Sequence, residues 1–214
     1  HIDVMFVSNI PFLITVSEPI KYTHVKKLLS RGVFHMRNAL LQVTQEYQDR
    51  GFSISNVYSD QELSLKNVVP TLSNHGIQLK FVGAGTHVPI VERKIRTLKE
   101  KIRCIIHSLE YKLSSFLLGK LVEYAANRTH LIPSRLFDEL VSPSEMFQGY
   151  TNNLTSELLL GFGDTAELHN AKDNTHNSVN SRTTPAIALG PSPQGAKGTW
   201  DFFSLSHHGG DGDS

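Results

Sequence analysis

The stretch from His87 to Arg103, HVPIVERKIRTLKEKIR, is the part of the sequence that most restricts the fold. From Glu92 onward, apolar side chains recur at alternating intervals of three and four residues, which is the pattern of a helix with one buried face. These apolar positions are Ile95, Leu98, Ile102, Ile105 and Leu109. The sequence therefore predicts a long amphipathic helix that buries one stripe of side chains.

One acid and three cations share a neighbouring face of this predicted helix. Arg96, Lys99 and Arg103 follow Glu92 by four, seven and eleven residues, so the four side chains project in one row. In such a row the acid could bind a metal ion and the cations could bind phosphates. The same row could also be an ordinary solvated face on which Glu92 pairs with Arg96. The helix alone leaves both interpretations open.

Composition excludes several classes of protein. The chain has 214 residues and a formal net charge of +1, so a surface that binds nucleic acid would have to be local. Cys104 is the single cysteine, which excludes a disulfide framework and a cysteine-based zinc site built within this chain. Its place in the predicted helix indicates a packed thiol. Because no apolar run approaches the length of a membrane span, we expect a soluble intracellular protein without membrane contact.

The rest of the first 150 residues alternates between strand-like and helix-like segments. Apolar or alternating runs predict strands at residues 2–8, 12–16, 22–29, 52–59 and 77–82. Helical periodicity predicts helices at residues 33–50, 62–73 and 113–130. Ser142 followed by Pro143 is typical of the start of a further short helix. The sequence thus predicts a mixed α/β domain.

The character of the sequence changes after Gly149. Short strands are predicted at residues 186–189 and 200–205, separated by Gly and Pro, with a polar stretch ahead of them. We therefore predict a small β module over residues 150–206. The end, HHGGDGDS at residues 207–214, has the composition of a disordered tail.

The first domain is predicted to span residues 1–149. Because the chain starts at His1 within a strand-like run, we expect this domain to lack its true N-terminal residues.

Three acids stand out by their position. Asp3 interrupts a strand that is otherwise apolar on both faces, Asp60 ends a second strand, and Glu92 opens the basic helix. A buried carboxylate costs several kcal/mol unless it is paired or binds a cation. Ligands gather at strand ends along one edge of an open α/β sheet, and a divalent cation relieves the repulsion between carboxylates brought together there. Ordinary turn and cap residues would give the same spacing, so both readings stay open.

The order of these elements resembles the ribonuclease H-like fold of retroelement integrases and transposases. Three segments carry the resemblance: IDVMF with Asp3, VYSDQE with Asp60, and GAGTHVPIVERKIRTLKEKIR with Glu92. The last is similar to the catalytic helix of copia-type retrotransposon integrases, in which a His/Asn-x-Pro-x-x-Glu-Arg pattern precedes a run of Arg and Lys. The resemblance implies a mixed five-stranded sheet flanked by helices. RTTPAIALGPSPQGAKGTWDFFSL resembles the small β-barrel that follows the core in copia-type polyproteins.

The resemblance also implies an activity. In this family the matching Asp, Asp and Glu, here Asp3, Asp60 and Glu92, bind two Mg²⁺ or Mn²⁺ ions. The reactions are 3′-end processing of the element's DNA and strand transfer of the 3′-hydroxyl into target DNA. DNA and further copies of the chain would be the partners, and the nucleus the expected place of integration. The candidate DNA contacts are Arg96, Lys99, Arg103, Arg93 and His87.

Two other functions fit the same residues. The chain could be a degenerate or fragmentary core that binds DNA without turnover. It could also be another nuclease on this fold, such as a ribonuclease H or junction resolvase, although the basic helix and the β module argue against that class. Glu62 and Asp164 are further acids that could be mistaken for ligands, and Glu62 is a candidate for supporting the metal ligands. Lys94 and Lys101 are expected to be solvated.

Overall fold

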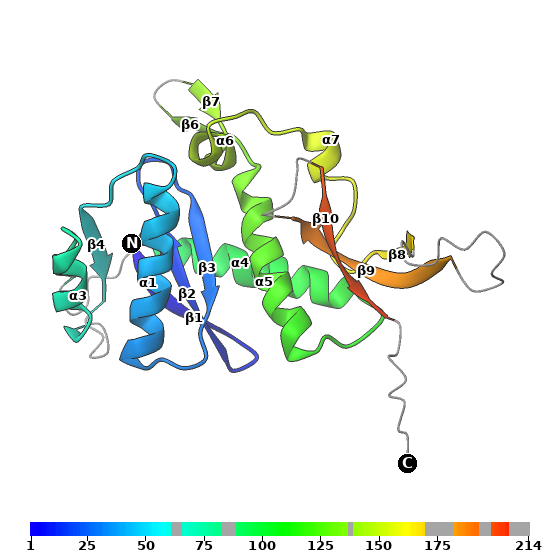
Figure 1. Ribbon diagram of the computed structural model, residues 1–214, viewed down its shortest axis with the longest axis horizontal. Coiled ribbons are helices and arrows are strands. Elements are labelled where there is room, and N and C mark those ends of the chain that lie inside the picture. The colour runs from blue at the N-terminus through cyan, green and yellow to red at the C-terminus, as the bar shows by residue number, and fades with distance from the viewer. Residues whose placement is uncertain (61–65, 83–88, 137–138, 170–181, 193–197, 206–214) are drawn as a thin grey trace, which may run out of the picture. The chain divides into compact units, whose positions relative to one another are not determined.

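The computed structural model describes residues 1–60, 66–82, 89–136, 139–169, 182–192 and 198–205. The chain divides into two compact units, residues 1–152 and residues 153–214. Figure 1 labels the helices and strands. Among the described residues, no helix has both the length and the hydropathy required to cross a membrane.

The first unit begins with three antiparallel strands in the order β1-β2-β3. They are β1 (Ile2–Val7), β2 (Ile10–Val16) and β3 (Thr23–Lys27). Ser8 and Asn9 join the first two strands with φ values of 47° and 64°. Positive φ at both positions of a two-residue turn matches the right-handed twist of a hairpin, which explains why the chain reverses so tightly here.

The central strand, β2, is buried on both faces. Phe12, Leu13 and Ile14 are all 0% exposed. Since neighbouring side chains of a strand point to opposite faces, consecutive buried residues require cover on both sides. The run of apolar residues in the sequence thus corresponds to a strand packed between two layers.

A parallel pair of strands follows, formed by β4 (Asn56–Ser59) and β5 (Gln78–Phe81), with α3 (Val69–Asn74) between them in the sequence. The prediction of one five-stranded sheet is therefore wrong. The five strands form two separate hydrogen-bonded sheets, one of three strands and one of two. The reason is that β1 and β4 meet through side chains. Ile2 and Val57 share one hydrophobic cluster, and the ring of His1 stacks on Tyr58 with centroids 5.1 Å apart.

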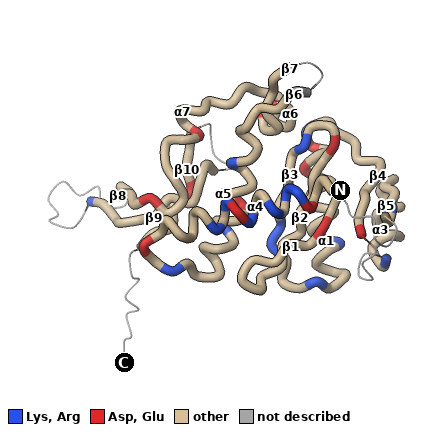
Figure 2. Tube along the Cα trace, turned by 180° about the vertical axis from the view of Figure 1, so that it is seen from behind, with Lys and Arg blue, Asp and Glu red and all other residues tan. Residues whose placement is uncertain are grey.

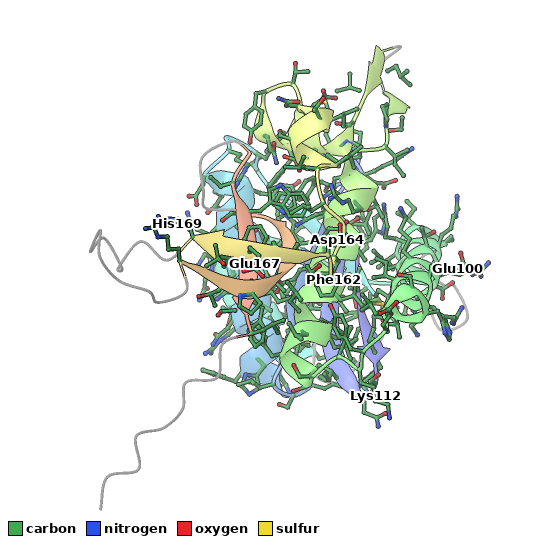
Figure 3. The ribbon with its side chains drawn as sticks, turned by 90° about the vertical axis from the view of Figure 1, so that its right-hand side faces the viewer. Glu100, Lys112, Phe162, Asp164, Glu167 and His169 are labelled. Atoms are coloured by element: carbon green, nitrogen blue, oxygen red, sulfur yellow. The ribbon has the colours of Figure 1, made fainter. Side chains whose placement is uncertain are left out.

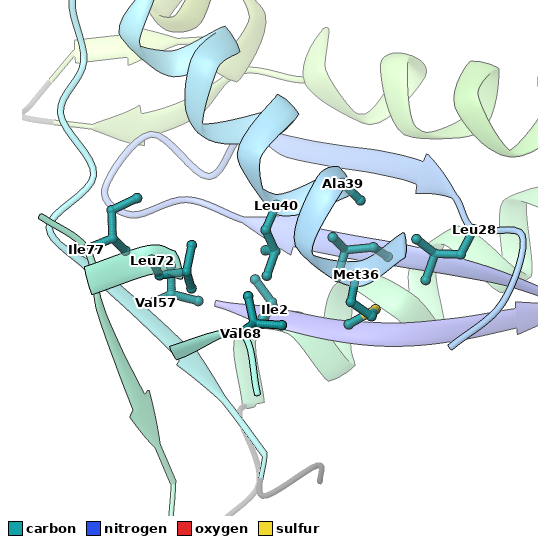
Figure 4. Packing of buried hydrophobic residues seen from close by; sticks show 10 residues of the cluster. Ile2, Leu28, Met36, Ala39, Leu40, Val57, Val68, Leu72 and Ile77 are labelled. Atoms are coloured by element: carbon teal, nitrogen blue, oxygen red, sulfur yellow. The ribbon is translucent and has the colours of Figure 1, made fainter. Parts of the chain in front are cut away.

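Helices cover both faces of β1–β3. Figure 1 shows α1 (Val33–Gln48) in front of the strands and α4 (Pro89–Ser108) behind them. α4 contacts β1 and β2, while α5 (Ser115–His130) contacts β3 and α4. Figure 4 shows the cluster on the α1 side, which includes Ile2, Leu13, Leu28, Met36, Ala39, Leu40, Val57, Val68, Leu72 and Ile77.

A short antiparallel pair, β6 (Ser134–Leu136) and β7 (Glu139–Val141), precedes α6 (Pro143–Gln148). No pattern in the sequence predicted this pair. The predicted start of α6 is confirmed, because the Ser142 hydroxyl accepts the Glu145 N–H at 3.2 Å and the Glu145 carboxylate accepts the Ser142 N–H at 3.1 Å. This reciprocal capping box satisfies two backbone donors at the helix start.

Stacked rings tie β3, α5 and α6 together. Tyr22 stacks on His130 at 3.9 Å and on Phe147 at 4.0 Å between centroids. The N–H of Thr23 donates to His130 Nε2 at 3.1 Å, so this nitrogen is an acceptor and the imidazole is neutral. Burial, assisted by the charge of Lys94, lowers the pKa of His130 from 6.5 to about 3. A neutral buried histidine therefore holds the junction of these elements.

The second unit contains α7 (Leu154–Glu157) and an antiparallel sheet in the order β10-β9-β8. The strands are β8 (Thr165–His169), β9 (Thr183–Pro191) and β10 (Trp200–Ser204). β9 and β10 include the two predicted strands, whereas β8 was not predicted. The tail at residues 207–214 lies outside the described residues.

Asp164 closes a turn at the start of this sheet. Its carboxylate accepts the Gly161 N–H at 2.7 Å, and its backbone carbonyl accepts the N–H of Ala188 at 2.8 Å. In Figure 3, Asp164 lies at one end of β8, with Glu167 and His169 further along the strand. The second unit thus uses Asp164 as a structural turn residue.

The buried neutral state of His130 predicts a pH dependence of stability. Because its pKa is lower in the folded than in the unfolded chain, its contribution is present above pH 6.5 and is lost as pH falls toward 3. The substitution His130→Gln keeps an acceptor for Thr23 but takes up no proton. We expect it to reduce the slope of unfolding free energy against pH by up to about 1.4 kcal/mol per pH unit. Urea unfolding between about pH 7 and pH 4 measures it.

His75→Gln is the matched control, since His75 is exposed on the surface beside α3. It should keep the slope of the wild-type protein. Equal slopes for His130→Gln and the wild type would contradict the assignment of a neutral buried His130.

Candidate active site

Asp3 lies on β1 and faces the α4 side of the sheet. Ile2 belongs to the cluster on the α1 side, and Val4 packs against that cluster. Because side chains alternate along a strand, Asp3 projects to the opposite face, where α4 contacts β1. The carboxylate is half-buried, and its Oδ1 accepts the N–H of Val4 at 2.7 Å.

Asp60 directly follows β4 and is exposed. The stacked rings of His1 and Tyr58 hold the start of β1 beside β4. Asp3 and Asp60 each lie two residues beyond one of these rings, a distance of about 7 Å along an extended chain. Asp3 and Asp60 therefore belong to strands that contact one another, Asp3 on β1 and Asp60 directly after β4.

Lys80 lies on β5, beside β4, although no pattern in the sequence indicated it. It pairs with Tyr58 across the parallel ladder of β4 and β5, and its ammonium lies 5.7 Å from the centre of the Tyr58 ring. The ring face attracts the positive charge of this ammonium group. The register of two short strands places it, and no motif in the sequence marks that register.

The predicted buried stripe of α4 is confirmed at its centre, and its side chains toward the two ends are more exposed. Leu98 and Ile102 are buried, while Ile95 and Ile105 are half-buried. The packed thiol predicted for Cys104 is wrong, because Cys104 is exposed. It follows Ile102 by two residues, which is about 200° around the helix axis and so opposite the stripe.

The row that begins with Glu92 lies on one flank of α4. Glu92 is half-buried, whereas its cationic followers are exposed. Figure 2 shows Lys and Arg residues in blue along this helix. At about 100° per residue, the row lies about 100° from the buried stripe. The exposed cations on this helix are Arg93, Arg96, Lys99 and Arg103.

The contact made by Lys94 shows on which side of α4 the Glu92 row lies. Its ammonium donates to Thr129 Oγ1 of α5 at 3.4 Å, and burial together with the charges of Lys101 and Lys21 lowers its pKa. The prediction that Lys94 is solvated is therefore wrong, because α5 covers it. On the helical wheel Glu92 lies on the other side of the stripe. The Glu92 row thus lies on the flank of α4 opposite the one that α5 covers.

Of the elements that carry the predicted triad, β1 contacts both β4 and α4. Within the described part of the chain, no three His, Cys, Asp or Glu side chains lie close enough to hold a metal ion jointly. His87 and Glu62 lie outside the described residues. The donor chemistry of three carboxylates suits a hard divalent cation such as Mg²⁺ or Mn²⁺.

Comparison with known proteins gives a fold but no family. No protein-family model matches the chain, and no curated protein matches its sequence. Among solved structures, the catalytic core domain of BIV integrase aligns with a TM-score of 0.54 and 14% identity, covering 69% of this chain and 91% of that chain. The chain therefore has a fold similar to that of an integrase catalytic core.

Proposed function

We propose that this protein is a metal-dependent DNA-integration enzyme similar to the integrases of copia-type retrotransposons. The observation that supports the proposal is an integrase-like fold in which β1, which carries Asp3, contacts both α4, which carries Glu92, and β4, which Asp60 follows. The reactions proposed are 3′-end processing of element DNA and strand transfer into target DNA. Both reactions attack a phosphodiester, so one site can carry out the two steps.

Asp3, Asp60 and Glu92 are proposed to hold two Mg²⁺ or Mn²⁺ ions. Ions bound there would activate the attacking oxygen and stabilise the leaving oxygen of the phosphodiester. Asp3 is steadied by the N–H of Val4, and Glu92 is carried by a helix whose stripe is locked against β1 and β2.

The cations after Glu92 are proposed to bind the DNA backbone. Arg96, Lys99 and Arg103 are exposed in the row of Glu92, and Arg93 is exposed beside it. Contacts of this kind position the duplex and carry no sequence information. Because two element ends must be joined to one target, we propose that the protein acts as at least a dimer on DNA and works in the nucleus.

Substitution of Glu92 tests the catalytic role. We expect Glu92→Gln, which keeps size and polarity but removes a charged ligand, to lower strand transfer by at least about 100-fold in Mn²⁺. The measurement follows a labelled element-end duplex joined to target DNA in Mg²⁺ and in Mn²⁺.

The matched control is Glu100→Gln, on the same helix and exposed (Figure 3). It should leave strand transfer unchanged. Activity retained by Glu92→Gln would refute the proposed ligand. DNA binding without turnover in the wild type would instead identify a non-catalytic remnant, and cleavage of RNA–DNA hybrids without strand transfer would identify a ribonuclease H-like nuclease.

The salt dependence of DNA binding tests the cationic row. Each phosphate contact releases counterions and adds about 0.9 to the slope of log K against log salt. We expect the double substitution Arg96→Ala/Lys99→Ala to reduce this slope by about 1.8. Fluorescence anisotropy with a labelled duplex at several salt concentrations measures it.

Lys112→Ala is the control, because Lys112 is exposed beyond the end of α4. Its slope should equal that of the wild type. A slope that the double substitution does not change would exclude the row as the phosphate contact.

A further inference from the structure

A second group of cations lies on the flank of α4 opposite the Glu92 row. Lys94 and Lys101 are seven residues apart on this helix, so they lie about 20° from one another around its axis and about 10 Å apart along it. Lys94 lies about 160° around the axis from Glu92. Both lysine side chains are half-buried, so each keeps part of its surface open. The two lysines therefore share a side of α4 that the row does not reach.

The turn between β2 and β3 brings a third lysine to these two. The Lys94 ammonium donates to Thr129 Oγ1 at 3.4 Å. The next residue of α5, His130, stacks on Tyr22, which directly follows Lys21 in the chain. Lys21 is exposed, and its charge acts on Lys94. We call this group the lysine face, and its members are Lys21, Lys94 and Lys101.

The lysine face has no neutralising acid in the described part of the chain. There the Lys94 ammonium contacts a neutral hydroxyl, and the ammonium groups of Lys21 and Lys101 form no ion pair with a carboxylate. Glu18, in the same turn as Lys21, contacts His1 instead at 2.9 Å. Burial, and after it the charges of Lys101 and Lys21, lower the pKa of Lys94. The three cations thus repel one another, and a bound anion would relieve that repulsion.

The spacing of the charges favours a polyanion with regular phosphates. About 10 Å along α4 corresponds to about three nucleotide steps of 3.4 Å along one strand of a duplex, so phosphates of one strand can reach both Lys94 and Lys101. Lysine binds phosphate as a flexible point charge and needs no fixed geometry. A symmetric second copy of the chain would instead place lysines against lysines, which opposes association.

A duplex on the Glu92 row cannot be this polyanion. The row and the lysine face lie on opposite flanks of one helix, and α5 packs along the flank of Lys94. A straight duplex that lies on one flank leaves the other flank free. The lysine face therefore needs a DNA segment of its own.

We propose that the lysine face binds the phosphate backbone of a second DNA duplex. Lys21, Lys94 and Lys101 contact phosphates, and the bond to Thr129 preorganises Lys94. The identification of the polyanion as DNA rests on the proposed function, in which element DNA and target DNA must be held together. The lysines themselves stand apart from the proposed metal ligands and from the Glu92 row.

The test measures the salt dependence of duplex binding in the Arg96→Ala/Lys99→Ala background, in which the row contributes less. We expect the added substitutions Lys21→Gln/Lys101→Gln to reduce the slope of log K against log salt by about 1.8, because two phosphate contacts are lost. Glutamine removes the charge but keeps much of the apolar stem, so the packing of the half-buried side chain is preserved. Fluorescence anisotropy with a labelled duplex measures the slope.

Lys66→Gln/Lys112→Gln is the matched control, because both lysines are exposed and lie outside the lysine face. It removes the same charge and should leave the slope unchanged. Lys21→Arg/Lys101→Arg keeps the charge and should also leave it unchanged. The proposal is overturned by an unchanged slope in Lys21→Gln/Lys101→Gln or by an equal fall in the control. Polyglutamate that binds these two lysines more tightly than the duplex, at equal charge, would likewise overturn it and identify an acidic peptide.

The reactions distinguish the two sources of DNA. If Lys21→Gln/Lys101→Gln alone loses strand transfer but keeps 3′-end processing, the lysine face holds target DNA. Loss of both reactions assigns it to element DNA. A slope that falls as expected while the wild type shows neither reaction supports the lysine face without the proposed function. Strand transfer together with an unchanged slope removes the lysine face alone.

Discussion

The burial of β2 on both faces is the constraint on which the first unit depends. Leu13 meets the cluster beneath α1, while its neighbours Phe12 and Ile14 point to the side of α4 and α5. This two-sided burial separates the unit into two helix layers. Asp3, one strand away and paired with Ile14, is thereby placed on the α4 face. A substitution that opened either layer would disturb the candidate site without touching it.

Packing on two sides also fixes the rotation of α4 about its axis. Leu98 and Ile102 are buried, and Lys94 contacts Thr129 on α5. With these two sides occupied, the Glu92 row lies on the flank away from α5. Lys94 is thus a positioning residue, and its partial burial costs the protein some of the stability of a charged ammonium.

The sequence predicted most elements of the first unit, because α1, α4 and the first two strands have strong periodicity or continuous apolar runs. It could not predict that β1 and β4 meet through side chains, since hydrogen-bond partners depend on tertiary packing. The exposure of Cys104 agrees with its position opposite the buried stripe of the helix. The burial of Lys94 depends on where α5 packs, which helical periodicity does not encode. The strand β8, with its polar residues, also lacks the apolar pattern that marks the others.

The candidate site was predicted as three residues and a helix row, and in the fold β1 contacts both β4 and α4, which are the elements that carry these residues. The proposed metal site is tested most directly by a crystal structure of the protein with Mn²⁺ and an element-end duplex, in which anomalous scattering locates the ions. We predict Mn²⁺ bound by the carboxylates of Asp3, Asp60 and Glu92 together. Carboxylates that point to different faces, or Mn²⁺ bound away from them, would contradict the proposed site.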